Sequence, residues 1–84
     1  MKLQIMCVRD IKVGAYQTPF YAATIGAGER SFSDAINNPN KDSDMSKHPT
    51  DFELYLLGIY DDDTGKFDTH EPKFITNGAA NAKL

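Results

Sequence analysis

The strongest constraint on the fold is the stretch DFELYLLGIY at residues 51–60, where apolar side chains recur with a period of two. That period is typical of a β-strand. The DDDTG segment at 61–65 follows, and its glycine can supply the positive φ of a turn. A short strand at residues 66–69 completes a predicted β-hairpin over 51–69. The alternation assigns one face of the first strand to Phe52, Leu54, Leu56, Gly58 and Tyr60.

The first part of the chain predicts two more strands and a helix. Residues 2–9, KLQIMCVR, alternate as a strand, and residues 10–18 read as a loop or wide hairpin connection. Residues 19–25 form the second strand, with Pro19 at its start, where a missing N–H is tolerated. Residues 26–37 predict a helix with Gly26 as N-cap and an apolar stripe. That stripe consists of Phe32, Ala35 and Ile36.

The element order β-β-α-β-β predicts an α+β fold. We expect a small antiparallel sheet of about four strands, with one helix on a face. A small barrel of the oligonucleotide-binding type is the alternative, although four clear strands are one short of it. Residues 40–50 are polar apart from Met45 and read as a long surface loop.

The chain of 84 residues has room for one hydrophobic core. We expect a single domain over residues 1–76 and a flexible C-terminal tail over 77–84. A chain of this length buries only about two-thirds of the surface that it exposes when unfolded, so its stability should be modest. Association is a common remedy, and exposed strand edges favour it, so a homodimer is expected.

Charge and cysteine content narrow the function classes. The net charge of −3 argues against a general polyanion binder, although the positions of the nine Lys and Arg residues matter more than the total. Cys7 is the single cysteine and excludes an internal disulfide or a cysteine zinc site, which fits a reducing cytoplasm. The longest apolar run, residues 54–60, is far too short to span a membrane.

Nothing in the sequence predicts catalysis, a metal or a cofactor. The serines lack a nucleophile-elbow context, and the two histidines are far apart in sequence. The DDDTG turn resembles the start of a calcium loop, but that loop needs Gly at position six and Glu at position twelve. Counted from Asp61, those positions hold Lys66 and Pro72. We therefore expect a solvated turn and a protein that is not an enzyme.

Single-stranded nucleic acid requires cations for its phosphates and aromatic faces for its bases. Such residues occur in the first strands and their connection, at the start of the helix and in the long loop. Core packing is the alternative for each aromatic ring, and a turn-shaping role is the alternative for the histidine. The residues predicted to bind DNA are Arg9, Lys12, Tyr16, Phe20, Arg30, Lys47 and His48.

Three segments in this order, RDIKVGAY…PF, RSFSDAINNPN and SKHPTDFELYLLGIYDDDTGKF, carry a family resemblance over about residues 7–67. The chain resembles the small non-structural DNA-binding protein of gokushovirus-type microviruses, which are tailless single-stranded DNA bacteriophages. The matching positions are Asp10, Lys12, Pro19, Phe20, Arg30, Phe32, Asp34, Asn37, Pro39, Lys47, His48, Pro49, Asp51, Gly58, Tyr60, Asp61, Thr64 and Gly65. The segment KDSDMS is more acidic than the family pattern leads one to expect.

The resemblance implies a protein of the host bacterial cytoplasm that is not a component of the virus shell. It implies DNA binding and a role in viral DNA replication, in the synthesis or packaging of single-stranded DNA. Single-stranded DNA is then the expected partner. The alternative is an adaptor that binds a host or phage replication protein, which the net acidity and the long loop favour.

Overall fold

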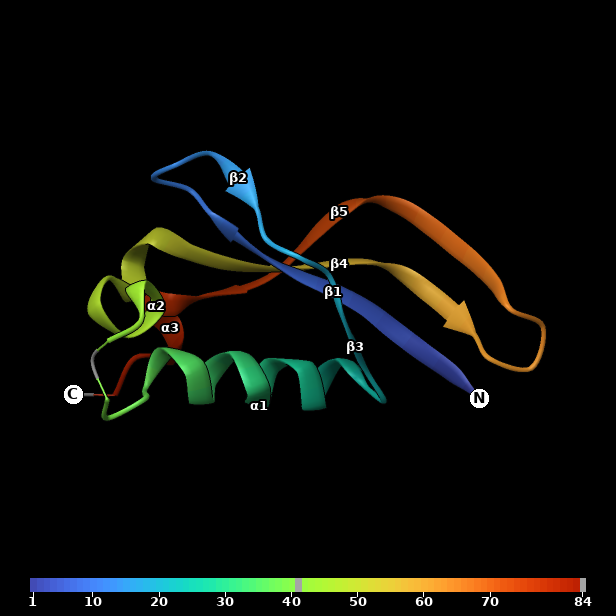
Figure 1. Ribbon diagram of the computed structural model, residues 1–84, viewed down its shortest axis with the longest axis horizontal. Coiled ribbons are helices and arrows are strands. Elements are labelled where there is room, and N and C mark those ends of the chain that lie inside the picture. The colour runs from blue at the N-terminus through green and yellow to red at the C-terminus, as the bar shows by residue number, and fades with distance from the viewer. Residues whose placement is uncertain (41, 84) are drawn as a thin grey trace.

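The sheet is built around two long central strands, β1 (Lys2–Asp10) and β4 (Phe52–Asp61), which pair antiparallel along their whole length. The computed structural model describes residues 1–40 and 42–83. β5 (Lys66–Asn77) forms one edge next to β4, while β2 (Ala15–Tyr16) and β3 (Phe20–Ala22) share the other edge next to β1. The predicted antiparallel α+β fold is confirmed, and the sheet of the described residues is open between these two edges (Figure 1).

The helix α1 (Ile25–Ile36) covers one face of the sheet (Figure 1). It begins one residue before the predicted range, and its N-cap is Thr24 and not Gly26 as predicted. The Thr24 hydroxyl accepts a hydrogen bond from the Ala27 backbone N–H at 3.0 Å. A side-chain oxygen satisfies one of the free N–H groups of the first turn, which glycine cannot do.

The core lies between α1 and the two central strands. Phe32 and Ile36 are buried on the sheet side of α1, as the predicted stripe requires. Gly28 is buried one turn earlier, where an added Cβ would overlap the sulfur of Met6. The absence of a side chain there lets the helix approach β1 closely. The buried core cluster consists of Met6, Val8, Phe32, Ile36, Phe52, Leu54 and Leu56.

β5 is three times as long as the predicted strand of residues 66–69. Pairing with β4 runs from Lys66 to Thr69, breaks at residues 70–72, and resumes with Lys73 opposite Leu56. Pro72 cannot donate a ladder hydrogen bond and lies within that break, where prolines are tolerated. Local sequence signals end at the proline, so they miss the part of the strand beyond it.

The segment predicted as a long loop contains two helical turns, α2 (Asp44–Lys47) and η1 (Pro49–Asp51). The Ser43 side chain caps α2 by accepting from the Ser46 N–H at 3.3 Å, and Ser46 is buried. The prediction missed this turn because only Met45 is apolar. Lys41, also in the predicted loop, lies outside the described residues.

The predicted C-terminal tail of residues 77–84 is corrected for its described part. Asn77 ends β5, and α3 (Gly78–Asn81) packs on η1, where Gly78 is buried and a Cβ would overlap the Pro49 carbonyl. The Asn37 amide donates to the Asn81 carbonyl at 2.8 Å, and the Lys83 N–H donates to Asn37 Oδ1 at 2.8 Å. Leu84 lies outside the described residues. These contacts hold the end of the chain against the end of α1.

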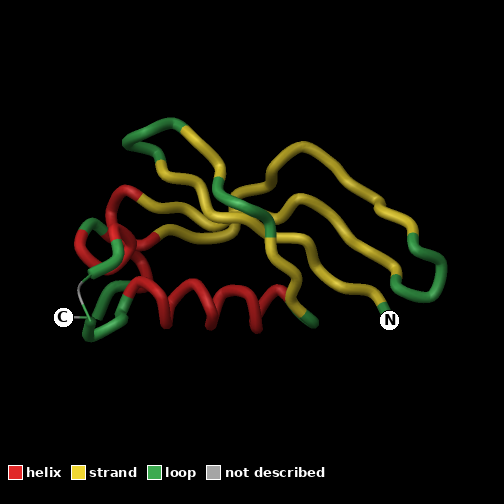
Figure 2. The backbone as a smooth tube through the Cα atoms, viewed as in Figure 1, coloured by secondary structure: helices red, strands yellow, loops and turns green. Residues whose placement is uncertain are grey.

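The two halves of the sheet differ in what covers them. Figures 1 and 2 show α1 beneath one half, with α2 and α3 gathered at the same end as the C-terminus. The turn between β4 and β5 and the N-terminus lie at the opposite end, beyond α1. The sheet face opposite α1 has no helix against it in the described part of the chain, and this open face holds the candidate site.

Candidate nucleic-acid interface

A β-bulge decides which side chains of β4 reach the open face. Residues directly opposite each other in an antiparallel pair share a face. Cys7 lies opposite Tyr55 and Ile5 lies opposite Gly58, so the register shifts by one residue around Leu57. Gly58 therefore has the same facing as Tyr55, and so does Tyr60 beyond it. The predicted alternation, which grouped Tyr60 with Phe52, is wrong because it assumed an uninterrupted strand.

The open face carries two rows of aromatic rings that run across the strands; we call the two rows together the aromatic face. The first row consists of Tyr16, Tyr55 and Phe74, with ring centroids 5.5 and 5.9 Å apart. The second row consists of Tyr21, Tyr60 and Phe67, with centroids 5.9 and 4.9 Å apart. The outer rings are well exposed: Tyr16 45%, Tyr21 51%, Phe67 60% and Phe74 49%.

The nine aromatic residues divide cleanly between the two faces. All four tyrosines and two phenylalanines form the aromatic face. The other three phenylalanines belong to the core or pack against it. Tyrosine suits a partly solvent-exposed surface because its ring is apolar and its hydroxyl is polar. The division leaves six rings on the face opposite the core.

Small apolar side chains of β1 lie beneath the rings. Ile5 is 5% exposed and Cys7 is 1% exposed, yet neither belongs to the core cluster on the α1 side. Burial raises the pKa of the Cys7 thiol, since the thiolate would be poorly solvated there. Ile5 and Cys7 thus form a buried apolar layer beneath the aromatic face, and the role of the Cys7 side chain is to pack there.

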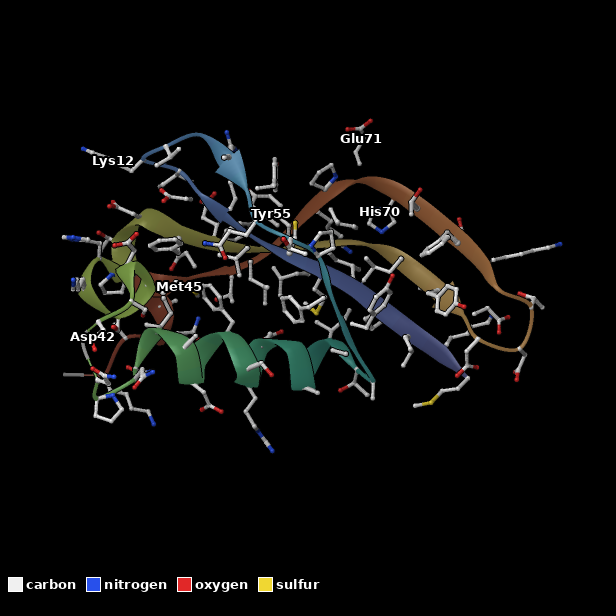
Figure 3. The ribbon with its side chains drawn as sticks, viewed as in Figure 1. Lys12, Asp42, Met45, Tyr55, His70 and Glu71 are labelled. Atoms are coloured by element: carbon white, nitrogen blue, oxygen red, sulfur yellow. The ribbon has the colours of Figure 1, made fainter. Side chains whose placement is uncertain are left out.

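Arg9, Lys12 and Tyr16 lie on β1, on β2 and in the connection between them. Arg9 pairs with Tyr16 across the strands, and its guanidinium carbon lies 5.3 Å from the centre of the Tyr16 ring. Asp10 shapes the turn by accepting hydrogen bonds from the backbone N–H groups of Lys12 and Val13. Lys12 is exposed at the tip of this connection (Figure 3).

The other four predicted DNA-binding residues are not brought to the aromatic face. Phe20 pairs with Met6 and packs against the core, which points its ring to the α1 side. Arg30 is exposed on α1, in the other layer. Lys47 and His48 are exposed at the end of α2, which adjoins the β1–β2 turn through η1, where the Ile11 N–H donates to the Asp51 carbonyl at 2.8 Å.

A polar pair lies beside the first row of rings. Glu53 lies opposite Arg9 on β4, and its Oε1 accepts a hydrogen bond from the Tyr55 hydroxyl at 2.8 Å. This hydrogen bond is the main reason why the pKa of Tyr55 is raised, and burial adds to it. The nearby Arg9 acts in the opposite direction and lowers that pKa. Figure 3 shows Tyr55 near the middle of the sheet, well separated from α1.

The acidic turn between β4 and β5 lies at the far end of the molecule. The carboxylates of Asp61, Asp62 and Asp63 have oxygens within 4.8 Å of one another. The N-terminal ammonium lies 2.7 Å from Asp62 Oδ1 and 2.9 Å from Asp63 Oδ2. The three carboxylates of this turn would repel phosphates, so this turn is a poor contact for a nucleic acid.

Most of the aromatic face was not found by sequence reasoning. Tyr55 was assigned to the correct side of its strand, but the prediction gave it no role in binding. Tyr60 was hidden by the bulge, and Phe74 by the proline that precedes it. Aromatic residues at alternate positions in two adjacent predicted strands would be the only available signal, and here both strands are irregular.

Residues 3–81 match the model of a protein family described as "Phage ORF5 protein". The match spans nearly all of the described residues and includes both rows of the aromatic face. The chain matches no curated protein and no solved structure. None of the helices in residues 1–40 and 42–83 is long and apolar enough to cross a membrane.

Proposed function

This chain belongs to the phage ORF5 protein family, and from that premise we propose that it binds single-stranded DNA on the aromatic face. Its role would be in viral genome replication, in the synthesis or packaging of single-stranded DNA. It would act in the cytoplasm of the host bacterium as a non-structural protein without enzymatic activity. The sequence resemblance to the microvirus DNA-binding protein favours the same reading.

The observation that best supports the proposal is the pair of exposed ring rows beside a cation. Bases of a single strand stack on aromatic side chains with about 1–3 kcal/mol per base, whatever their sequence. Tyr16 is half exposed and carries the Arg9 guanidinium against it, so a stacked base would lie beside a positive charge. A DNA duplex keeps its base faces covered, so this surface suits single strands.

Fluorescence anisotropy with a labelled oligothymidylate tests the proposal. We expect binding at low salt that weakens as salt is raised, because phosphate contacts release counterions. Tyr16→Ala should weaken binding about tenfold, which corresponds to the loss of one stacked base. Val13→Ala is the matched control, since Val13 is a 75% exposed apolar residue at the tip of the same connection. Absence of binding at low salt, or binding indifferent to salt, would overturn the proposal.

A second candidate is an adaptor that binds a basic host or phage replication protein. The clustered carboxylates of Asp61, Asp62 and Asp63 at the end of the β4–β5 hairpin favour it. Nuclease treatment of an infected-cell lysate before a pull-down separates the two functions. A partner lost after treatment indicates capture through DNA, whereas a partner retained after treatment and lost in Asp62→Asn with Asp63→Asn indicates the adaptor.

The expected homodimer remains a prediction, and β5 is the element that would form it. β5 is an edge strand of twelve residues whose outer side has no strand against it in the described chain. Pairing of two such edges would place two aromatic faces side by side. Size-exclusion chromatography with light scattering measures the mass directly, and a mass of 9.3 kDa at all concentrations would exclude the dimer.

A further inference from the structure

Two opposite charges face each other beside the first ring row without forming an ion pair. Arg9 and Glu53 are direct cross-strand partners on β1 and β4. Such neighbours commonly attract each other across a strand pair. Here the guanidinium turns onto the Tyr16 ring and Glu53 accepts from Tyr55 instead. Within residues 1–40 and 42–83, only the N-terminal ammonium forms ion pairs with carboxylates.

The Arg9 side chain is incompletely satisfied. Its Nε is buried and has no hydrogen-bond partner among the described residues. A buried donor without a partner is destabilising, and the more so in a charged group. Glu53 can also accept a further hydrogen bond. Its only side-chain hydrogen bond in the described chain uses Oε1, which leaves Oε2 without a partner. A donor-only group and an acceptor-only group thus stand side by side, each with unused capacity.

The aromatic rings beside this pair define what kind of molecule could contact both groups. Tyr16 pairs with Arg9 across the strands, Tyr55 follows Glu53 two residues along β4, and the two rings are in edge-to-face contact, with centroids 5.5 Å apart and planes at 72°. A flat, apolar-faced molecule with acceptors and donors along its edge would stack on a ring and meet both charged groups. A nucleobase is such a molecule, and unpaired bases are read on their Watson–Crick and Hoogsteen edges.

Guanine matches this arrangement best among the four DNA bases. Its O6 and N7 are adjacent acceptors, the pair that arginine commonly contacts. Its N1–H and N2–H₂ are adjacent donors, which a carboxylate can accept together. Thymine presents one N–H between two carbonyls, so a carboxylate would face an oxygen. Adenine and cytosine each offer one amino group beside a ring-nitrogen acceptor, which satisfies one carboxylate oxygen only.

We propose that Arg9 and Glu53 read a base edge and select guanine at the position beside the Tyr16–Tyr55 ring pair. This inference rests on the proposed function, because it requires single-stranded DNA on the aromatic face. It adds one selective position to an otherwise sequence-tolerant surface. The second row, Tyr21, Tyr60 and Phe67, would stack any base.

The experiment compares four labelled 12-mers: oligothymidylate, and the same strand with one central guanine, adenine or cytosine. A single guanine avoids structures that guanine runs adopt. We expect the guanine strand to bind at least fivefold tighter than oligothymidylate, since one bidentate contact discriminates by about 1–3 kcal/mol. Adenine and cytosine should fall between them.

Glu53→Gln keeps an oxygen that can accept from Tyr55 but loses one of the two acceptors offered to guanine. We expect it to abolish the guanine preference while binding of oligothymidylate is kept or improved, since a negative charge is removed. Glu29→Gln is the matched control, because it makes the same change on α1, in the other layer. It should keep the preference. Thermal unfolding of both variants checks that the fold is retained.

The outcomes separate the two proposals. Equal binding of all four strands, with oligothymidylate binding still weakened by Tyr16→Ala, overturns base reading and leaves single-stranded DNA binding in place. A guanine preference that survives in Glu53→Gln also overturns it. Failure to bind any of the four strands at low salt overturns both proposals. A preference for guanine that is lost only in Glu53→Gln supports base reading.

Discussion

A Cβ atom on Gly58 would overlap the backbone carbonyl oxygen of Asp68 on the neighbouring strand and lie 2.7 Å from the Cα of Thr69. Gly58 also has a φ of +152°, which L side chains rarely adopt. The residue sits at the bulge that returns β4 to the aromatic face. The second ring row therefore depends on a position that only glycine fits.

Gly58→Ala should lower the free energy of unfolding by about 3 kcal/mol, because backbone strain and overlap with β5 act together. Gly65→Ala is the control: its φ is also positive, at +71°, but no atom lies within 4 Å of the added Cβ. It should cost about 1 kcal/mol. Urea unfolding followed by circular dichroism measures both, and equal losses would show that overlap with β5 is unimportant.

The sequence predicts the fold through regular patterns and fails where the patterns are interrupted. The alternation in residues 52–56 and the stripe of Phe32 and Ile36 suffice for a sheet with a helix on one face. The bulge at Leu57 and the break at Pro72 depend on pairing between segments, so no local period reveals them. Arg9 and Tyr16 are close in sequence and pair across a short connection, whereas the rings of β4 and β5 join them from segments far away in sequence.

The C-terminal segment escaped prediction for a similar reason. GAAN carries no apolar stripe, and its attachment to the domain comes from polar contacts with the end of α1. A hydrogen bond between residues 44 positions apart, such as Asn37 and Asn81, produces no local sequence pattern. A short polar segment after the last strand therefore reads as a tail even when a distant asparagine holds it.

Asn37→Ala should release this segment. The Asn37 side chain donates to the Ser33 and Asn81 carbonyls and accepts from the Lys83 N–H. At about 1 kcal/mol per hydrogen bond, the variant should lose roughly 1–3 kcal/mol of stability. Amide hydrogen exchange at Lys83 should also become faster. Asn38→Ala, the exposed neighbour, should change stability by less than about 0.5 kcal/mol. Unchanged exchange at Lys83 in Asn37→Ala would contradict the bridge.

Tyr55 should give the protein a pH dependence on the alkaline side. Its pKa in the folded chain is raised above the ordinary value of 10.0, chiefly by the hydrogen bond to Glu53. The stabilisation from its protonated hydroxyl is therefore complete below about pH 10 and is lost as the pH rises through the folded-state pKa. Subtracting the ultraviolet absorbance titration of Tyr55→Phe from that of the unmodified chain isolates this step.

Glu53→Gln should lower the pKa of Tyr55 towards its ordinary value, because the neutral amide no longer opposes ionisation of the phenol. The difference titration, repeated with Tyr55→Phe in the Glu53→Gln background, should then show its midpoint at lower pH. An unchanged midpoint would mean that burial, the second cause, controls the pKa of Tyr55.

The path of the DNA can be traced by removing one cation at a time. Lys12 lies exposed at the tip of the β1–β2 connection, near the first ring row, whereas Arg30 is exposed on α1 in the other layer. For single strands, each neutralised phosphate contributes about −0.7 to the slope of log affinity against log salt. Lys12→Ala should therefore make the slope shallower by about 0.7, and Arg30→Ala should leave it unchanged. Anisotropy titrations at four salt concentrations give both slopes. A reduced slope in Arg30→Ala alone would place the strand over α1 and remove the aromatic face from the binding path.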